Sequence, residues 1–186
     1  MILTITGPRS VGKTTVSKLV AKKLKLKFYS SDEIGEKALK KQGGLDKAIK
    51  SGKIEKLIKS SAYDLIRKTY EKDNFVFDLS GGSVTSRKYP QASEKVRQIA
   101  NKKSIVIGLL PSKNNKESIN FLFEREKERE HFKDLKKAEL FEKVKKDYKK
   151  FPPLFKRFCN SIIYVENKSP EELADEMVNR IKKYNF

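Results

Sequence analysis

A glycine-rich segment near the N-terminus constrains this sequence more than any other feature. Residues 7–14 read Gly-Pro-Arg-Ser-Val-Gly-Lys-Thr and match G-x-x-x-x-G-K-[ST], the phosphate-binding P-loop. An apolar run, Met1–Ile5, precedes the loop. The stretch that follows is amphipathic, and its apolar face carries Val16, Leu19, Val20 and Leu24. Because the P-loop occurs between a strand and a helix, this context supports the motif.

Each residue type in the loop suits the phosphates of a nucleotide. Gly7 and Gly12 permit backbone angles and close approaches that a side chain would resist. The loop amides can then converge on phosphate oxygens at the positive end of a helix dipole. Lys13 can reach the β and γ phosphates, and the Thr14 hydroxyl can ligate Mg²⁺, with Thr15 as a second hydroxyl. The alternative is an ordinary glycine turn that caps a helix. We predict that the phosphate site comprises Gly7, Pro8, Arg9, Ser10, Val11, Gly12, Lys13, Thr14 and Thr15.

Apolar runs alternate with helical patterns along the rest of the chain. After the first run, we expect strands at Leu26–Tyr29, Asn74–Leu79, Ser104–Leu110 and Ser161–Val165. The expected helices are Asp32–Lys41, Ile54–Tyr70, 91–101, 115–150, which Pro152-Pro153 would end, and a last helix that Ser169-Pro170 begins. This alternation predicts an α/β fold, a parallel sheet with helices on both faces. No linker or repeat interrupts it, so residues 1–186 are expected to form one domain.

The composition argues against several classes of protein. The single cysteine permits no intramolecular disulfide, and one histidine without a Cys/His cluster makes a structural zinc site unexpected. No apolar stretch has the length of a membrane span or the form of a signal peptide, so we expect a cytoplasmic protein without a membrane partner. The net charge of +19 suits phosphate-bearing ligands and would attract nucleic acid non-specifically. A lysine-rich solvated surface is the simpler explanation of that charge.

Residues at the predicted carboxyl ends of strands are candidates for the rest of a site, because ligands of open α/β sheets bind there. Asp78 could support Mg²⁺ together with Thr14, or it could cap the next loop. Gly81 and Gly82 follow the same strand, and backbone amides there could contact an acceptor substrate unless they form a plain turn. Asp32 could orient an acceptor hydroxyl or accept its proton, although a helix N-cap needs the same residue type.

Two arginines one helical turn apart could close over a phosphate. Arg125 and Arg129 lie in the charged segment 121–132, where two guanidinium groups on one face could clamp a transferring phosphoryl group. The alternative is a solvated helix with pairs of opposite charge. His131 could stack on a base or bind a phosphate, but a lone histidine is more often simply packed.

These motifs, in this order and spacing, resemble shikimate kinase and its small-kinase relatives, which include gluconate kinase and the nucleoside monophosphate kinases. The resemblance rests on residues 7–15, 28–32, 79–82, the two arginines and 169–173. It implies a five-stranded parallel sheet in the order 2-3-1-4-5, ATP as the donor, Mg²⁺, a mobile lid at approximately 121–135, and an acceptor-binding helical region at approximately 32–70. The catalytic residues expected from it are Lys13, Asp32, Arg125 and Arg129. Asp32, Gly81 and Gly82 would bind the acceptor, and Thr14 and Asp78 would hold the metal.

The acceptor side departs from the shikimate kinase pattern. Where the family has Asp-x-Asp, this chain has Ser30-Ser31-Asp32, so only the substrate-side aspartate remains. Two arginines that would hold the carboxylate of shikimate are also absent. Residues 52–57 contain none, and the family's Arg-x-Pro-Leu-Tyr is replaced by Phe151-Pro152-Pro153-Leu154-Phe155. Because lysine does not replace a bidentate arginine, we expect an ATP- and Mg²⁺-dependent kinase of a small hydroxyl acceptor with an altered acceptor site.

Two other functions are compatible with the sequence. A nucleoside monophosphate kinase needs arginines that face the acceptor phosphate, for which Arg67, Arg87 and Arg97 are candidates. A nucleic-acid-associated ATPase or nucleotide switch would suit the net charge of +19, but we find no RNA-recognition signature and no aromatic-basic stacking motif. The sequence favours no particular oligomeric state.

Overall fold

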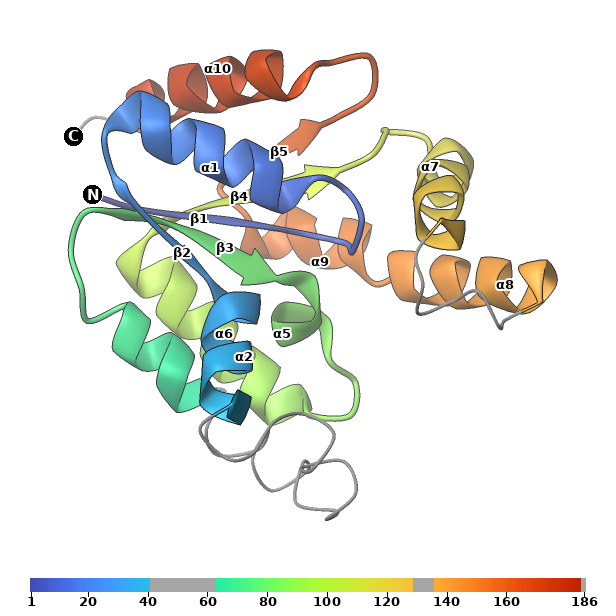
Figure 1. The fold of residues 1–186 in the computed structure, drawn as a ribbon, viewed down its shortest axis with the longest axis horizontal. Coiled ribbons are helices and arrows are strands. Elements are labelled where there is room, and N and C mark those ends of the chain that lie inside the picture. Colours follow the sequence, from blue (N-terminus) through green and yellow to red (C-terminus); the bar gives the residue numbers. More distant parts are fainter. Residues whose placement is uncertain (41–62, 129–135, 185–186) are drawn as a thin grey trace.

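A five-stranded parallel sheet forms the centre of the molecule, with its strands in the order β2-β3-β1-β4-β5 (Figure 1). The computed structural model describes residues 1–40, 63–128 and 136–184. Its strands are β1 (Ile2–Gly7), β2 (Lys27–Ser30), β3 (Phe75–Ser80), β4 (Ile105–Leu110) and β5 (Ser161–Tyr164). The strand order, the parallel direction and the strand positions confirm the predicted fold.

Helices cover both faces of this sheet. They are α1 (Lys13–Leu24), α2 (Ser31–Lys40), α5 (Gly81–Thr85), α6 (Pro90–Lys103), α7 (Asn115–Lys127), α8 (Lys137–Tyr148), α9 (Phe151–Phe158) and α10 (Pro170–Ile181), which the short 3₁₀ helix η2 (Lys182–Tyr184) follows. Residues 63–69 are also helical. In Figure 1, α1 and α10 lie side by side on one face, and α6 and α9 lie on the other. Among the described helices, none is long and apolar enough to cross a membrane.

The central strands form the core. Nearly every residue of β1, β3 and β4 is buried, as expected for parallel strands that are covered on both faces. Each of these strands ends at the same edge of the sheet, so the residues that follow them come together there. At the other end of the chain, Ser169 and Glu172 form a reciprocal capping box at the start of α10, which confirms the predicted start of the last helix.

The prediction of one continuous helix over residues 115–150 is wrong. Instead, α7 ends at Lys127 and α8 begins at Lys137, and the two helices run in different directions (Figure 1). They pack through the rings of Phe123 and Phe141, whose centroids are 5.4 Å apart. The proline pair does not end a helix, because it lies in the first turn of α9. Backbone N–H groups in a first turn have no partner within the helix, so proline, which lacks this group, is tolerated there. The segment 129–135, with Arg129 and His131, lies outside the described residues.

Candidate active site

The P-loop connects the last residue of β1 to the first residue of α1. Gly7 is required there by packing, because a Cβ atom would lie 2.6 Å from the carbonyl oxygen of Leu109. Gly12 is required by its backbone, whose φ of 97° is left-handed. Ser10 also has a left-handed φ, 63°, which a serine rarely adopts. The loop thus has a tightly constrained path at the start of a helix, where phosphate oxygens bind.

Three residues predicted to act together do meet at the start of α1. The Thr14 Oγ1 atom donates a hydrogen bond of 2.6 Å to Oδ2 of Asp78 on β3, and Lys13 Nζ donates one of 3.0 Å to the Pro8 carbonyl oxygen. Asp78 is buried, and burial raises the pKa of its carboxyl, a rise that the Thr14 hydrogen bond and the charge of Lys13 oppose. A buried carboxylate oxygen beside a hydroxyl fits the hard oxygen ligands that Mg²⁺ prefers.

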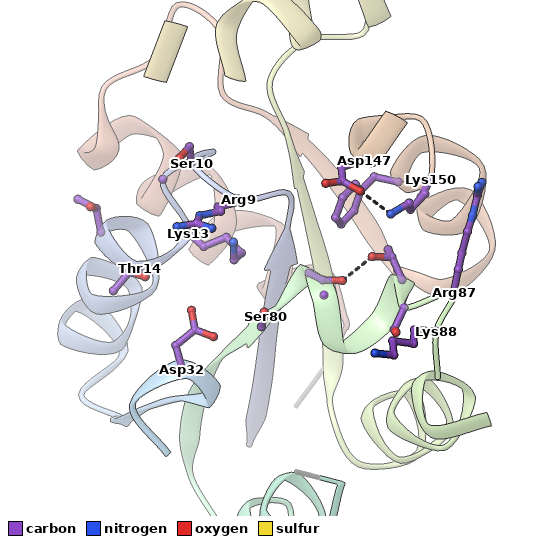
Figure 2. Close-up of a pocket in the computed structure, with 17 residues that line it drawn as sticks. Arg9, Ser10, Lys13, Thr14, Asp32, Ser80, Arg87, Lys88, Asp147 and Lys150 are labelled. Carbon is purple, nitrogen blue, oxygen red and sulfur yellow. Dashed lines mark hydrogen bonds and ion pairs between the residues drawn. The ribbon is translucent and has the colours of Figure 1, made fainter. Parts of the chain in front are cut away.

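Asp32 lies in the first turn of α2 and is exposed. Because that helix begins at Ser31, the alternative that Asp32 is an N-cap is wrong. The backbone N–H of Ser80 donates to Ser31 Oγ over 2.8 Å, which joins the end of β3 to the start of α2. Figure 2 shows the Asp32 carboxylate pointing toward the side of the site that carries Lys13 and Thr14. The charge of Asp32 also contributes to the raised pKa of Asp78.

A cleft of about 800 Å³ connects these residues at the carboxyl edge of the sheet. Figure 2 shows the P-loop residues and Asp32 on one side and Arg87, Lys88, Asp147 and Lys150 on the other. Of the predicted phosphate and acceptor residues, those that line the cleft are Arg9, Ser10, Gly12, Lys13, Thr14, Thr15, Asp32, Gly81 and Gly82. Gly7, Pro8 and Val11 are buried and do not line it.

Gly81 and Gly82 do not form a plain turn, because they begin the short helix α5. A Cβ atom at Gly81 would lie 2.2 Å from the Gly7 carbonyl oxygen and 2.8 Å from the ring of Phe151. At Gly82, the nearest atom to a Cβ would be Ser80 Oγ, at 3.7 Å. The first glycine therefore lets β3, the P-loop and α9 approach one another at the floor of the cleft.

The comparisons with known proteins agree with this geometry. A model of the shikimate kinase family matches residues 9–182. This chain belongs to the shikimate kinase family. Together with the fold, the family identifies it as a small P-loop kinase, an enzyme of phosphoryl transfer. Among curated protein sequences, no significant match is found.

Solved structures of other kinases share the fold of this kinase. Shikimate kinase from Acinetobacter baumannii, solved in complex with shikimate, is 20% identical with a TM-score of 0.76, over 100% of this chain and 94% of that one. Shikimate kinase from Aquifex aeolicus is 22% identical with a TM-score of 0.68, over 99% and 98% of the two chains. A gluconokinase from Sinorhizobium meliloti is 12% identical with a TM-score of 0.54, over 99% and 97%.

The far wall of the kinase cleft contains residues that sequence reasoning did not assign to a site. Asp147 and Lys150 form an ion pair of 2.5 Å at the junction of α8 and α9, and Phe151 lines the cleft beside them. Because one continuous helix was predicted over residues 115–150, nothing in that pattern indicated that Asp147 and Lys150 would line a cleft. The proline pair that follows was the one local signal of a new element.

The last turn of α7 contacts the P-loop of the kinase. Arg125 Nη1 donates to the Ser10 carbonyl oxygen over 3.2 Å, and the guanidinium packs 4.2 Å from the centroid of the Phe121 ring. Arg125, which the sequence analysis assigned to a lid, thus lies beside the P-loop. Glu126, which the sequence analysis did not single out, also contacts the loop.

Proposed function

We propose that this kinase transfers the γ-phosphoryl group of ATP, with Mg²⁺, to a hydroxyl group of a small molecule. The observation that carries the proposal is the 2.6 Å contact between Thr14 and the buried Asp78, beside a cleft that Thr14 and Asp32 line. Phosphoryl transfer needs a phosphate cradle, a metal held by a P-loop hydroxyl and a carboxylate, and a group that orients the nucleophile. The described residues supply one candidate for each of these roles.

Each residue has a defined role in this proposal. Lys13 and the loop amides hold the phosphates of ATP, while Thr14 and Asp78 hold Mg²⁺. When bound, Mg²⁺ neutralises part of the charge on the phosphate oxygens. Asp32 orients the acceptor hydroxyl and accepts its proton. Amides of the Gly81 and Gly82 region contact the acceptor, and Arg125 with Arg129 stabilises the charge on the transferring group.

An altered acceptor site is supported by the position of Phe151. It begins the segment in which shikimate kinases carry an arginine, and its side chain lines the cleft while it packs against Phe155 at 5.4 Å between ring centroids. An apolar ring offers no hydrogen bonds to a carboxylate. Because the chain belongs to the shikimate kinase family, shikimate, which the Acinetobacter baumannii relative binds in its structure, and related polyol acids are the first acceptors to test. The absence of the arginine predicts that a carboxylate acceptor binds weakly.

A second candidate, a nucleoside monophosphate kinase, is favoured by Arg87. Of the three arginines considered for it, Arg67 pairs with Glu71 and Arg97 pairs with Glu94, whereas Arg87 lines the cleft opposite the P-loop. A guanidinium in that position could bind an acceptor phosphate through two hydrogen bonds.

The test is ADP release in the presence of ATP and Mg²⁺, with Lys13→Ala as the blank. Parallel reactions contain shikimate, gluconate, each nucleoside monophosphate, RNA or no acceptor. Stimulation by one hydroxyl compound supports the proposal and identifies its acceptor, and stimulation by a monophosphate supports the second candidate. Hydrolysis that only RNA stimulates would overturn both and establish a nucleic-acid-associated ATPase.

A further inference from the structure

Glu126 is a buried acid in an unfavourable position. It is 4% exposed and lies in the last turn of α7, one residue before the helix ends. A negative charge there faces the negative end of the helix dipole, and burial removes the water that would stabilise it. Neither helix formation nor solubility therefore explains a glutamate at this position.

Two partners of Glu126 lie in the P-loop. Its Oε1 accepts a hydrogen bond from Ser10 Oγ and lies 3.6 Å from Nε of Arg9. An ion pair with arginine and a hydrogen bond to a hydroxyl are the partners that stabilise a buried carboxylate. The acid thus connects α7 to two consecutive residues of the loop.

Ser10 is the residue of the loop whose backbone needs such support. Its left-handed φ of 63° is unfavourable for any residue except glycine. Two contacts from the last turn of α7 hold it: its hydroxyl donates to Glu126, and its carbonyl oxygen accepts from Arg125. Without the first contact, the loop could relax to a path on which its amides no longer converge.

We propose that Glu126 is a positioning residue of the phosphate-binding loop, which it supports by holding Ser10 in its left-handed conformation. Glu126 acts through Ser10 and touches no substrate itself. The proposal rests on the proposed function, because it takes the phosphates of a nucleotide as the ligand of the loop. It predicts that nucleotide affinity depends on Glu126 only while residue 10 carries a side chain.

Glycine at position 10 separates this role from a general structural one. It adopts a left-handed φ readily, so a loop with Ser10→Gly needs no support from α7. The experiment measures the Kd of Mg-ADP and Mg-ATP by calorimetry for Glu126→Ala and Glu126→Gln, each in the wild-type and the Ser10→Gly background. Thermal unfolding of every variant is measured beside it. Glu124→Ala is the matched control, since Glu124 is an exposed acid on the same helix and pairs with Lys127.

In the wild-type background, we expect Glu126→Ala to weaken nucleotide binding about 10-fold, and Glu126→Gln about 3-fold, because glutamine still accepts from Ser10. In the Ser10→Gly background, each change should weaken binding less than about 2-fold. Glu124→Ala should bind as the wild type does. The glutamine variants, which keep the shape of the side chain, carry the test if the alanine variants do not fold.

Three results would overturn the inference. The first is that wild type and both Glu126 variants bind nucleotide with equal affinity. The second is that the Glu126 changes weaken nucleotide binding equally in the wild-type and Ser10→Gly backgrounds, which would mean that Glu126 does not act through Ser10 and has only a general structural role. The third is a wild-type protein that binds neither nucleotide, and this result alone would also overturn the proposed function.

Discussion

The Oγ1 atom of Thr14 lies 2.6 Å from Oδ2 of Asp78, although the two residues are 64 positions apart in the chain. The sheet order explains the contact: β1 and β3 are neighbours, with Ile5 opposite Asp78 in the register. The loop that follows β1 therefore starts α1 beside the carboxyl end of β3. A metal site at this place depends on the pairing of these two strands as much as on the motif.

Changing Asp78→Asn should stabilise the unliganded protein and lower kinase activity by about 100-fold. Burial raises the pKa of Asp78 in the folded protein, so ionising the carboxyl costs folding free energy. The free energies of unfolding of wild type and variant should therefore differ least at pH values below the ordinary carboxyl pKa, where Asp78 is protonated in both the folded and the unfolded protein. The advantage of the variant should grow as pH rises through the folded pKa. Denaturant unfolding at several pH values, with chelator and without nucleotide, measures this. A wild type more stable than the variant at neutral pH would contradict the prediction.

Lys13→Ala should lower kcat/KM by about 100-fold or more, since it removes the cation that faces the β and γ phosphates. Its effect on folding should be small, because Lys13 lines the cleft and is not buried. ADP release measures the activity and thermal unfolding measures the fold. Lys22→Ala, an exposed lysine on the same helix, is the control and should behave as wild type. Activity within a few-fold of wild type would exclude the assigned role.

Asp32→Asn should lower kcat by about 100-fold or more, because an amide cannot accept the proton of the acceptor hydroxyl. The KM for ATP should stay within about 3-fold, since the proposed contact is to the acceptor. Initial rates at varied ATP and acceptor concentrations separate the two constants. The neighbouring acid Glu33 is also exposed but does not line the cleft, so Glu33→Gln should change neither. A raised KM for ATP with unchanged kcat would mean that Asp32 serves the nucleotide instead.

Gly81→Ala should destabilise the protein by about 1–3 kcal/mol, whereas Gly82→Ala should change its stability by about 0.5 kcal/mol or less. The added methyl at Gly81 would lie 2.2 Å from the Gly7 carbonyl oxygen, and the methyl at Gly82 has no atom closer than 3.7 Å. Denaturant unfolding compares the two variants directly. Equal stability of the two variants would contradict the prediction, because it would mean that Gly7 and Phe151 shift to accommodate the added methyl group without loss of folding free energy.

The sequence alone predicted the five strands of the sheet and the position of the P-loop. The glycine pattern before an amphipathic stretch indicated the P-loop, and five apolar runs lie within two residues of the five strands. Asp32 and Asp78 were proposed because residues at the carboxyl ends of parallel strands gather at one edge of a sheet, and the structure places Asp32 at the cleft and Asp78 beside Thr14. The strand positions could be predicted because local periodicity and motif spacing are properties of short stretches of chain.

Tertiary structure decided what the rest of the cleft contains. A helical pattern runs from residue 115 to 150, but α7 and α8 are separate helices that pack on each other, and the junction of α8 and α9 brings Asp147 and Lys150 to the far wall. The contact between Glu126 and Ser10 joins residues 116 positions apart. No periodicity encodes such contacts, because they depend on how complete helices dock on the sheet, which the packing of their side chains determines.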